Sequence, residues 1–353
     1  MPRELVFLGP RQVDYREYEE GEPGPGQIKL RTLYCGISHG TEMNVYRGTS
    51  PQFRKAVRDG LFVEGEPAYK YPMTYGYEEV AEVVAVGDGV ERVKVGDVVA
   101  TAYGHRETKV LDPSTAWRFH VVPPGFPPEQ AIFHSLAMVA LNDYLSSEIR
   151  LGESAVVIGL GVIGLFVLQL CRLGGVSPLV AVDLLPTRLE SARRFGAEQA
   201  LNPREVGDVA LAVREVLGGL GADVVFEHSG TYRGLHQAIR CCAPIYGKVM
   251  AVSWYQGAGS DLALGEEWHH SFTGRAGASQ MRHQTLGVPP APGRQWDSAR
   301  LGKTAFGLLT SGKVSTEGMI THRFPFSRAR EAYELIDQHP EETVKVILDF
   351  TAD

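Results

Sequence analysis

The feature that most constrains the fold is a glycine-rich turn between an apolar run and a helical pattern. Residues 154–160 read SAVVIGL, and residues 161–175 read GVIGLFVLQLCRLGG. Gly159, Gly161 and Gly164 fit the spacing GxGxxG, which becomes specific only when a strand precedes it and a helix follows. The first glycine then permits a tight turn, the second lets a diphosphate approach the backbone, and the third lets the helix pack on the strand. The sequence therefore predicts a dinucleotide-binding βαβ unit.

An acidic residue follows this turn at the spacing expected for a ribose-binding carboxylate. The next apolar run, LVAVD, ends in Asp183, about 20 residues beyond the last glycine. A carboxylate there accepts hydrogen bonds from the ribose 2′-hydroxyl and repels a 2′-phosphate, so we expect NAD rather than NADP. Arg188 is close enough to flank the adenine, and it would weaken this preference if it turned toward the 2′ position. The phosphates would lie at the helix N-terminus, at Val162 and Ile163, where free N–H groups favour anions.

The pattern of apolar runs divides the chain into two regions with different predicted secondary structure. Up to about residue 125, short alternating runs are separated by Gly, Pro and Asp, which predicts a small antiparallel β-barrel. From about residue 130 to 275, apolar strands alternate with helical patterns, which predicts a parallel sheet with covering helices. Residues 285–297 form a Pro/Gly-rich loop, followed by two helical segments and a last strand, TVKVILDF. The fold class is therefore α/β, with a separate β-rich domain.

Charge and cysteine content limit the partners and the compartment. The 353 residues contain 35 Lys and Arg against 42 Asp and Glu, a formal net charge of −7, so neither a nucleic acid nor an anionic membrane is an expected partner. The first residues lack an apolar stretch of signal-peptide length, so we expect a cytoplasmic protein. The four cysteines (Cys35, Cys171, Cys241 and Cys242) form no CxxC pattern and are expected to be free and buried.

Three further stretches resemble the medium-chain dehydrogenase/reductase family. Residues 36–48, GISHGTEMNVYRG, resemble its GIC-GTD segment, and residues 75–100 resemble its GHE…VGDRV segment. Residues 222–257 resemble the second half of its Rossmann domain, so the resemblance covers nearly the whole chain. It implies a doubly wound Rossmann sheet with a GroES-like β-barrel catalytic domain, assembled as a homodimer or homotetramer. The implied domains are residues 1–134 (GroES-like), 135–276 (Rossmann) and 277–353 (a C-terminal segment returning to the GroES-like domain).

The chain departs from the family where zinc-type members bind metal. The GIC motif reads Gly36-Ile37-Ser38, and the GHE motif reads Gly76-Tyr77-Glu78. A serine hydroxyl and a phenol are poor zinc ligands because each must lose a proton of high pKa. Residues 100–120 contain no cysteine, so the structural zinc lobe is absent as well. We therefore expect no metal.

One alternative to this metal-free expectation stays open. The spacing between His134 and the glycine turn resembles that of the family's third zinc ligand. His39, Glu78 and His134 would then supply a nitrogen and oxygen ligand set. The other interpretation is that the histidines form hydrogen bonds in a polar pocket.

The variants GISxGTE and GYE resemble the branch of the family that includes bacteriochlorophyllide a dehydrogenase, whose members oxidise a secondary alcohol. The resemblance places Tyr77, His39, Ser38 and His134 toward the nicotinamide. We expect Tyr77 to donate to the substrate oxygen if its pKa is lowered, with a histidine relaying the proton and Glu78 supporting the tyrosine. The predicted function is NAD-dependent interconversion of a secondary alcohol and its ketone by hydride transfer, without catalytic zinc.

The substrate side of the cleft is implied by the same resemblance. It places Ser229 beside the cofactor and Trp254, Tyr255, Gln256 and Gln280 near the substrate. Aromatic faces together with amide and hydroxyl groups suit a polyhydroxylated or sugar-like alcohol, although Trp254 and Tyr255 are equally expected as packing residues of a strand. Two other functions remain open, a zinc-free quinone or enoyl reductase and a non-enzymatic NAD-binding protein.

Overall fold

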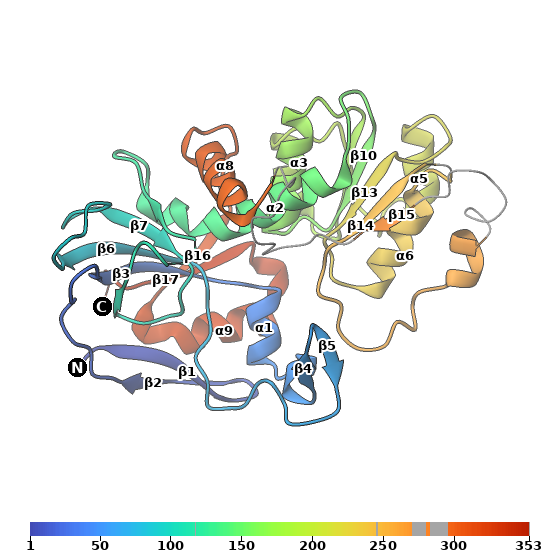
Figure 1. The fold of residues 1–353 in the computed structure, drawn as a ribbon. Coiled ribbons are helices and arrows are strands. Elements are labelled where there is room, and N and C mark those ends of the chain that lie inside the picture. Colours follow the sequence, from blue (N-terminus) through green and yellow to red (C-terminus); the bar gives the residue numbers. More distant parts are fainter. Residues whose placement is uncertain (117, 245, 270–279, 283–295, 353) are drawn as a thin grey trace. The chain divides into compact units, whose positions relative to one another are not determined.

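The computed structural model describes residues 1–116, 118–244, 246–269, 280–282 and 296–352, and these form two compact units (Figure 1). Unit 1 comprises Met1–Ser135, Phe306–Ser311 and Thr316–Asp353, and unit 2 comprises Leu136–Ala305 and Gly312–Ser315. Unit 2 extends beyond the expected boundary at residue 276, because a strand at Gln280–Arg282 still pairs within its sheet. Within the described residues, no helix has both the length and the apolar character that crossing a membrane requires.

Unit 2 is built on a six-stranded sheet whose strands all run parallel. The strand order is β12-β11-β10-β13-β14-β15, so successive strands are added on one side of β10 up to β12 and on its other side from β13 onward. This is the order of a doubly wound Rossmann sheet, and it confirms the predicted fold of this part of the chain. The strands are β10 (Ala155–Ile158), β11 (Leu179–Val182), β12 (Gln199–Leu201), β13 (Val224–Glu227), β14 (Lys248–Ala251) and β15 (Gln280–Arg282).

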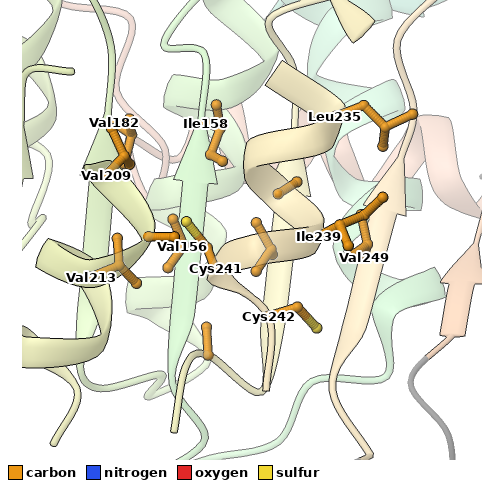
Figure 2. Packing of buried hydrophobic residues seen from close by; sticks show 14 of the residues in the cluster. Val156, Ile158, Val182, Val209, Val213, Leu235, Ile239, Cys241, Cys242 and Val249 are labelled. Atoms are coloured by element: carbon orange, nitrogen blue, oxygen red, sulfur yellow. The ribbon is translucent and has the colours of Figure 1, made fainter. Parts of the chain in front are cut away.

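The central strands of unit 2 are apolar because helices cover both faces of a parallel sheet. Every residue of β10, β11 and β13 is buried. Figure 2 shows part of this core, where Val156 and Val249 from the sheet lie among Val213 and Ile239 from helices. The helices that lie wholly in unit 2 are α3 (Val162–Leu173), α4 (Pro186–Arg194), α5 (Val209–Val216) and α6 (Tyr232–Cys241), with a π-turn, η3 (Leu264–Trp268). Helix α2 (His134–Ser147) begins in unit 1, and helix α8 (Ser298–Thr310) ends in it.

Unit 1 is built on a seven-stranded sheet with the order β16-β17-β3-β6-β7-β9, and β8 also pairs with β3. Its pairings are antiparallel as predicted, except that β16 and β17 run parallel. The sequence between these two strands forms a helix, α9, and a crossover helix allows a parallel pair. The strands are β3 (Ile28–Ile37), β6 (Glu79–Val86), β7 (Val98–Thr101), β8 (Thr108–Leu111), β9 (His120–Val121), β16 (Ile320–Pro325) and β17 (Lys345–Asp349).

Smaller elements surround this sheet and complete the unit 1 core. The hairpin β1–β2 packs beside α9, and its Phe7 meets Tyr333 of α9 edge to face, with ring centroids 5.5 Å apart. The four cysteines are free and buried, as predicted. The remaining elements are β1 (Arg3–Gly9), β2 (Gln12–Glu17), β4 (Ala56–Arg58), β5 (Leu61–Val63), α1 (Thr41–Tyr46) and α9 (Ala329–Gln338), with short 3₁₀ turns η1 (Pro51–Phe53), η2 (Pro128–Phe133), η4 (Phe326–Arg328) and η5 (Pro340–Glu342).

Candidate active site

The glycine turn of unit 2 lies between β10 and α3, where the motif predicts it. Gly159 has φ +88°, and a Cβ there would lie 2.4 Å from the backbone nitrogen of Ser229. A Cβ at Gly164 would lie 2.0 Å from the carbonyl oxygen of Gly159, so the helix can pack this closely only without a side chain. Gly161 is the N-cap of α3, and among the described residues other than its chain neighbours no atom lies within 4 Å of its Cβ position. The turn is therefore open at Gly161, immediately before Val162 and Ile163, the first residues of α3.

Asp183 follows β11 and lies beside this turn. Its carboxylate accepts hydrogen bonds from the backbone nitrogens of Leu160, at 2.7 Å, and Leu185, at 2.9 Å. Arg188 Nη1 lies 3.9 Å from Asp183 Oδ2. A carboxylate has about four acceptor positions, so it can bond a ribose diol while it holds the turn.

Ser229 and Tyr255 are joined through a buried carboxylate at the end of β13. Ser229 N donates to Glu227 Oε1 at 2.7 Å, and the Tyr255 hydroxyl donates to Glu227 Oε2. Tyr255 also stacks on Tyr232 at 5.3 Å and packs against the unit 2 core, but it lies in the loop after β14 and not in a strand. Gln280 is the first residue of β15, and its side chain lies outside the description.

The other two residues of the expected substrate side follow β14. Trp254 and Gln256 are both half-buried. The amide nitrogen of Gln256 lies 3.4 Å from the carbonyl oxygen of Trp254, and this long contact is a weak hydrogen bond. Trp254 and Gln256 flank Tyr255 in the loop that follows β14.

In unit 1, the structure brings Ser38 and Tyr77 together. Ser38 follows β3, Tyr77 precedes β6, and the Tyr77 hydroxyl donates a hydrogen bond to Ser38 Oγ. Ser135 Oγ donates to the backbone oxygen of Tyr77 at 3.2 Å. Burial, and then the nearby Glu78, raise the pKa of Tyr77, although its hydrogen bonds with Ser38 and Thr41 oppose the shift. The condition of a lowered pKa is therefore not met, and Tyr77 is a neutral phenol that donates its hydrogen bond.

Glu78, the residue after Tyr77, forms a buried ion pair. Its Oε2 contacts Lys345 Nζ of β17, and the two side chains are 0% and 1% exposed. Lys345 Nζ also donates to the backbone oxygen of Ile37 at 2.9 Å. A Cβ at Gly36 would lie 2.4 Å from Glu78 Oε2, so glycine is required where the pair crosses β3. Burial raises the pKa of Glu78 while Lys345 lowers it.

His134 is the first residue of α2 and is buried. Its Nε2 lies 3.0 Å from the backbone oxygen of Thr101, and a carbonyl can only accept, so Nε2 carries the proton. Burial, with His120 and Arg118 nearby, lowers the pKa of His134 well below its ordinary value. His134 is therefore a neutral hydrogen-bonding group.

His39 is half-buried beside Ser38. Among the described residues, the groups of His, Cys, Asp and Glu close enough to hold one ion are His236 with Glu266 and Glu267, and His339 with Glu341 and Glu342. The alternative set of His39, Glu78 and His134 is not one of these groups.

A second buried carboxylate, Glu42, was not anticipated as a site residue. Glu42 is fully buried at the start of α1, and its Oε2 accepts from the backbone nitrogen of Ser38 at 3.2 Å. Its Oε1 lies 2.7 Å from His105 Nε2 and accepts from the Tyr333 hydroxyl. Burial alone would raise the pKa of Glu42, but His105, Tyr333 and Ser38 together hold it below its usual range. The available signal was a charged residue in a segment that is otherwise apolar or small.

Two family models match the chain, and each falls within one of the two units. The alcohol dehydrogenase GroES-like domain matches residues 24–117. The zinc-binding dehydrogenase domain matches residues 162–279.

Relatives with an assigned activity align over most of the chain. D-guloside 3-dehydrogenase of Escherichia coli K12 is 28% identical over 359 residues, covering 99% of this chain and 100% of the relative. (R,R)-butanediol dehydrogenase of Bacillus subtilis is 31% identical over 273 residues, covering 70% and 76%. The crystal structure of 2R,3R-butanediol dehydrogenase from Bacillus subtilis has a TM-score of 0.78 at 23% identity and covers 99% of both chains.

The glycine turn supports a test that separates folding from dinucleotide binding. Gly161→Ala adds a methyl group in open space, so the free energy of unfolding should change by less than about 0.5 kcal/mol. The same methyl group would occupy the side from which a diphosphate approaches, so the Kd for NAD should rise about 10-fold or more. Gly164→Ala is the matched variant, and overpacking should lower its free energy of unfolding by about 1–3 kcal/mol. Urea titrations and calorimetric NAD titrations measure both quantities, and normal NAD affinity in Gly161→Ala would contradict this placement.

The ion pair of unit 1 gives a second test. Lys345→Met leaves the Glu78 carboxylate buried without its cation, so the free energy of unfolding should fall by about 3–5 kcal/mol. Adding Glu78→Gln to that variant should recover most of the loss, because no charge then stays buried. Arg31→Met is the control, since its pair with Glu82 is largely solvent-exposed and should contribute less than about 1 kcal/mol. Equal losses in the control and in Lys345→Met, measured by urea unfolding, would show that burial of the pair is unimportant.

Proposed function

The chain belongs to the medium-chain dehydrogenase/reductase superfamily, and we propose that it interconverts a ring or chain secondary alcohol and its ketone, using NAD and no catalytic zinc. The observation that carries the proposal is the combination of an intact nucleotide turn in unit 2 with the Ser38–Tyr77 hydroxyl pair in unit 1. The relatives support the reaction class, because D-guloside 3-dehydrogenase and (R,R)-butanediol dehydrogenase both take their names from secondary alcohols.

The residues of unit 2 support NAD as the cofactor. Held at the glycine turn and Asp183, NAD would supply the hydride acceptor for oxidation of the alcohol, and NADH would supply the donor for the reverse reaction. Asp183 presents a carboxylate beside the turn, and that charge disfavours a 2′-phosphate. Gly161 leaves the helix N-terminus open to the diphosphate.

The residues of unit 1 do not suit catalytic zinc at the family's position. Ser38 and Tyr77 are hydrogen-bonded to each other, and burial raises the pKa of Tyr77, which disfavours the phenolate that a metal would need. Cys35, the nearest cysteine in sequence, is buried in the core of unit 1, and burial raises the pKa of its thiol. Glu78 is already paired with Lys345. We therefore assign no step to a metal ion.

The hydroxyl pair can instead supply a hydrogen bond to the reacting oxygen. Tyr77 donates to Ser38 Oγ, so the hydroxyl hydrogen of Ser38 is left to donate to a substrate oxygen. Accepting a hydrogen bond from Tyr77 strengthens Ser38 as a donor, because chains of hydrogen bonds polarise one another. His39, half-buried and adjacent in sequence, is the group we assign to exchange the substrate's hydroxyl proton with solvent.

The proposed chemistry predicts that both hydroxyls contribute to turnover. Ser38→Ala and Tyr77→Phe should each lower kcat by roughly 10²–10⁴-fold, the usual contribution of such groups, with little change in the Kd for NAD. Ser50→Ala, which removes another buried hydroxyl of unit 1, should keep wild-type kcat. The assay uses NAD with 2,3-butanediol and methyl pyranosides, NADH with the corresponding ketones, and NADH with enones.

Three results would contradict this proposal. Turnover of enones alone would assign an enoyl reductase, and absence of any turnover would leave only cofactor binding. Tightly bound zinc in elemental analysis, together with loss of activity on chelation, would overturn the metal-free mechanism.

The Asp183 carboxylate predicts cofactor preference. NAD should bind at least about 10-fold more tightly than NADP, and Asp183→Ser should narrow that ratio by removing the repulsion of the 2′-phosphate. Since Asp183 also holds the turn through Leu160, Asp183→Asn is the more conservative comparison, because its amide oxygen can still accept one backbone bond. Calorimetric titration with both cofactors measures the ratio. Wild-type preference for NADP would show that Arg188, and not Asp183, decides the selectivity.

A further inference from the structure

Five aromatic rings of unit 1 form one continuous series of contacts that ends at the hydroxyl pair. Tyr71 stacks on Phe53 with ring centroids 4.5 Å apart, and Phe53 meets Tyr69 edge to face at 5.6 Å. Tyr69 meets Tyr75 at 6.0 Å, and Tyr75 meets Tyr77 at 6.5 Å. The last ring, Tyr77, donates to Ser38 Oγ. We call this series the aromatic run.

The aromatic run is held in place by backbone contacts. Tyr69 N donates to the backbone oxygen of Gln52 at 2.9 Å, and Ala68 N donates to that of Lys55 at 3.1 Å, so the two stretches that carry the rings are tied together. The Tyr71 hydroxyl donates to the backbone oxygen of Val45 in α1. The run is therefore pre-organised, and binding against it would need little reordering.

Each side chain at the middle of the run is only partly covered. Tyr69 and Tyr75 pack against the buried cluster around Phe7, Met43 and Tyr333, yet both stay half-buried. The core therefore covers part of each ring, and the rest of the ring stays accessible to solvent. The series of ring contacts itself continues from Tyr75 to Tyr77, whose hydroxyl is bonded to the buried Ser38.

The chemistry of the run is apolar on its faces, polar at its edges and uncharged. Burial, followed by its hydrogen bond with Tyr69, raises the pKa of Tyr75, so its phenol stays neutral. The carboxylates closest to the end of the run, Glu42 and Glu78, are bonded to His105 and Lys345. Rings with hydroxyl edges complement a ligand with apolar C–H faces and hydroxyl edges, which describes a pyranoside ring.

We propose that Tyr69 and Tyr75 form a binding subsite for the sugar ring of the substrate, and that this subsite presents one ring hydroxyl to Ser38 and Tyr77. This inference rests on the proposed function and adds specificity residues to it. A short diol such as 2,3-butanediol would reach the hydroxyl pair without contacting Tyr69 or Tyr75, so the two substrates should depend differently on these two tyrosines.

The test compares two substrates in four proteins. Tyr69→Leu and Tyr75→Leu should raise KM for a methyl pyranoside by about 3- to 10-fold, as expected for the loss of one aromatic contact, with kcat nearly unchanged. Neither variant should change KM for 2,3-butanediol. Tyr103→Leu is the matched control, because Tyr103 is also a half-buried tyrosine of unit 1. It packs against a different buried cluster, the one around Leu30 and Val99, so its replacement should change KM for neither substrate.

The outcomes separate this inference from the proposed function. Turnover of 2,3-butanediol without turnover of any pyranoside, or equal loss of both activities in the variants, would overturn the subsite while the alcohol dehydrogenase function stands. If the wild type turns over neither substrate, the proposed function fails, and binding of the methyl pyranoside measured by saturation-transfer NMR decides the inference. Binding that weakens in Tyr69→Leu but not in Tyr103→Leu would support the subsite, and absence of binding would overturn it.

Discussion

The ion pair between Glu78 and Lys345 fixes the geometry on which the candidate site depends. Lys345 opens β17, contacts the residue immediately before β6, and donates to the backbone oxygen of Ile37 at the end of β3. Ser38 and Tyr77 are the neighbouring residues along those two segments, and β3 and β6 also pair directly, so their hydrogen bond lies between segments held by both the sheet and the lysine. The lysine meets a carboxylate and a carbonyl, whereas among the described residues Glu78 Oε1 has no hydrogen-bond partner, so the lysine is the group that offsets the buried negative charge. Gly36 provides the room for this crossing.

A second buried carboxylate acts on the same residues from the other side. Glu42 accepts from the backbone nitrogen of Ser38, and His105 and Tyr333 hold it from two other parts of unit 1. Ser38 is thus held through its own backbone nitrogen and through the carbonyl that precedes it. Because the backbone of Ser38 is fixed in this way, only its hydroxyl can change hydrogen-bond partners, and that hydroxyl accepts a bond from Tyr77. A donor held in this way needs no reorganisation when a substrate oxygen arrives.

The parts of the molecule that local sequence determines could be predicted, and the parts that depend on distant residues could not. The turn at Gly159–Gly164 and the acid at Asp183 belong to one βαβ unit, so their spacing alone indicated their arrangement. The same holds for the alternation that gave the parallel sheet of unit 2. The pairing of Glu78 with Lys345 joins residues far apart in the chain, and no spacing rule relates them. The sequence could not give the direction of the Tyr77 pKa shift for the same reason, because burial by the folded unit decides it.

The order in which the chain is synthesised gives the ion pair a further consequence. Unit 2 is encoded almost entirely between the two main segments of unit 1, so it can fold on the ribosome while the strand that carries Lys345 has not been made. During that interval Glu78 has no cation, and β3 lacks the partner strand that covers its edge. The nascent chain therefore passes through a stage in which unit 2 can be folded while the sheet of unit 1 still lacks β17. Chaperone binding or aggregation at that stage would act on the part of β3 that β17 later covers, Tyr34–Ile37.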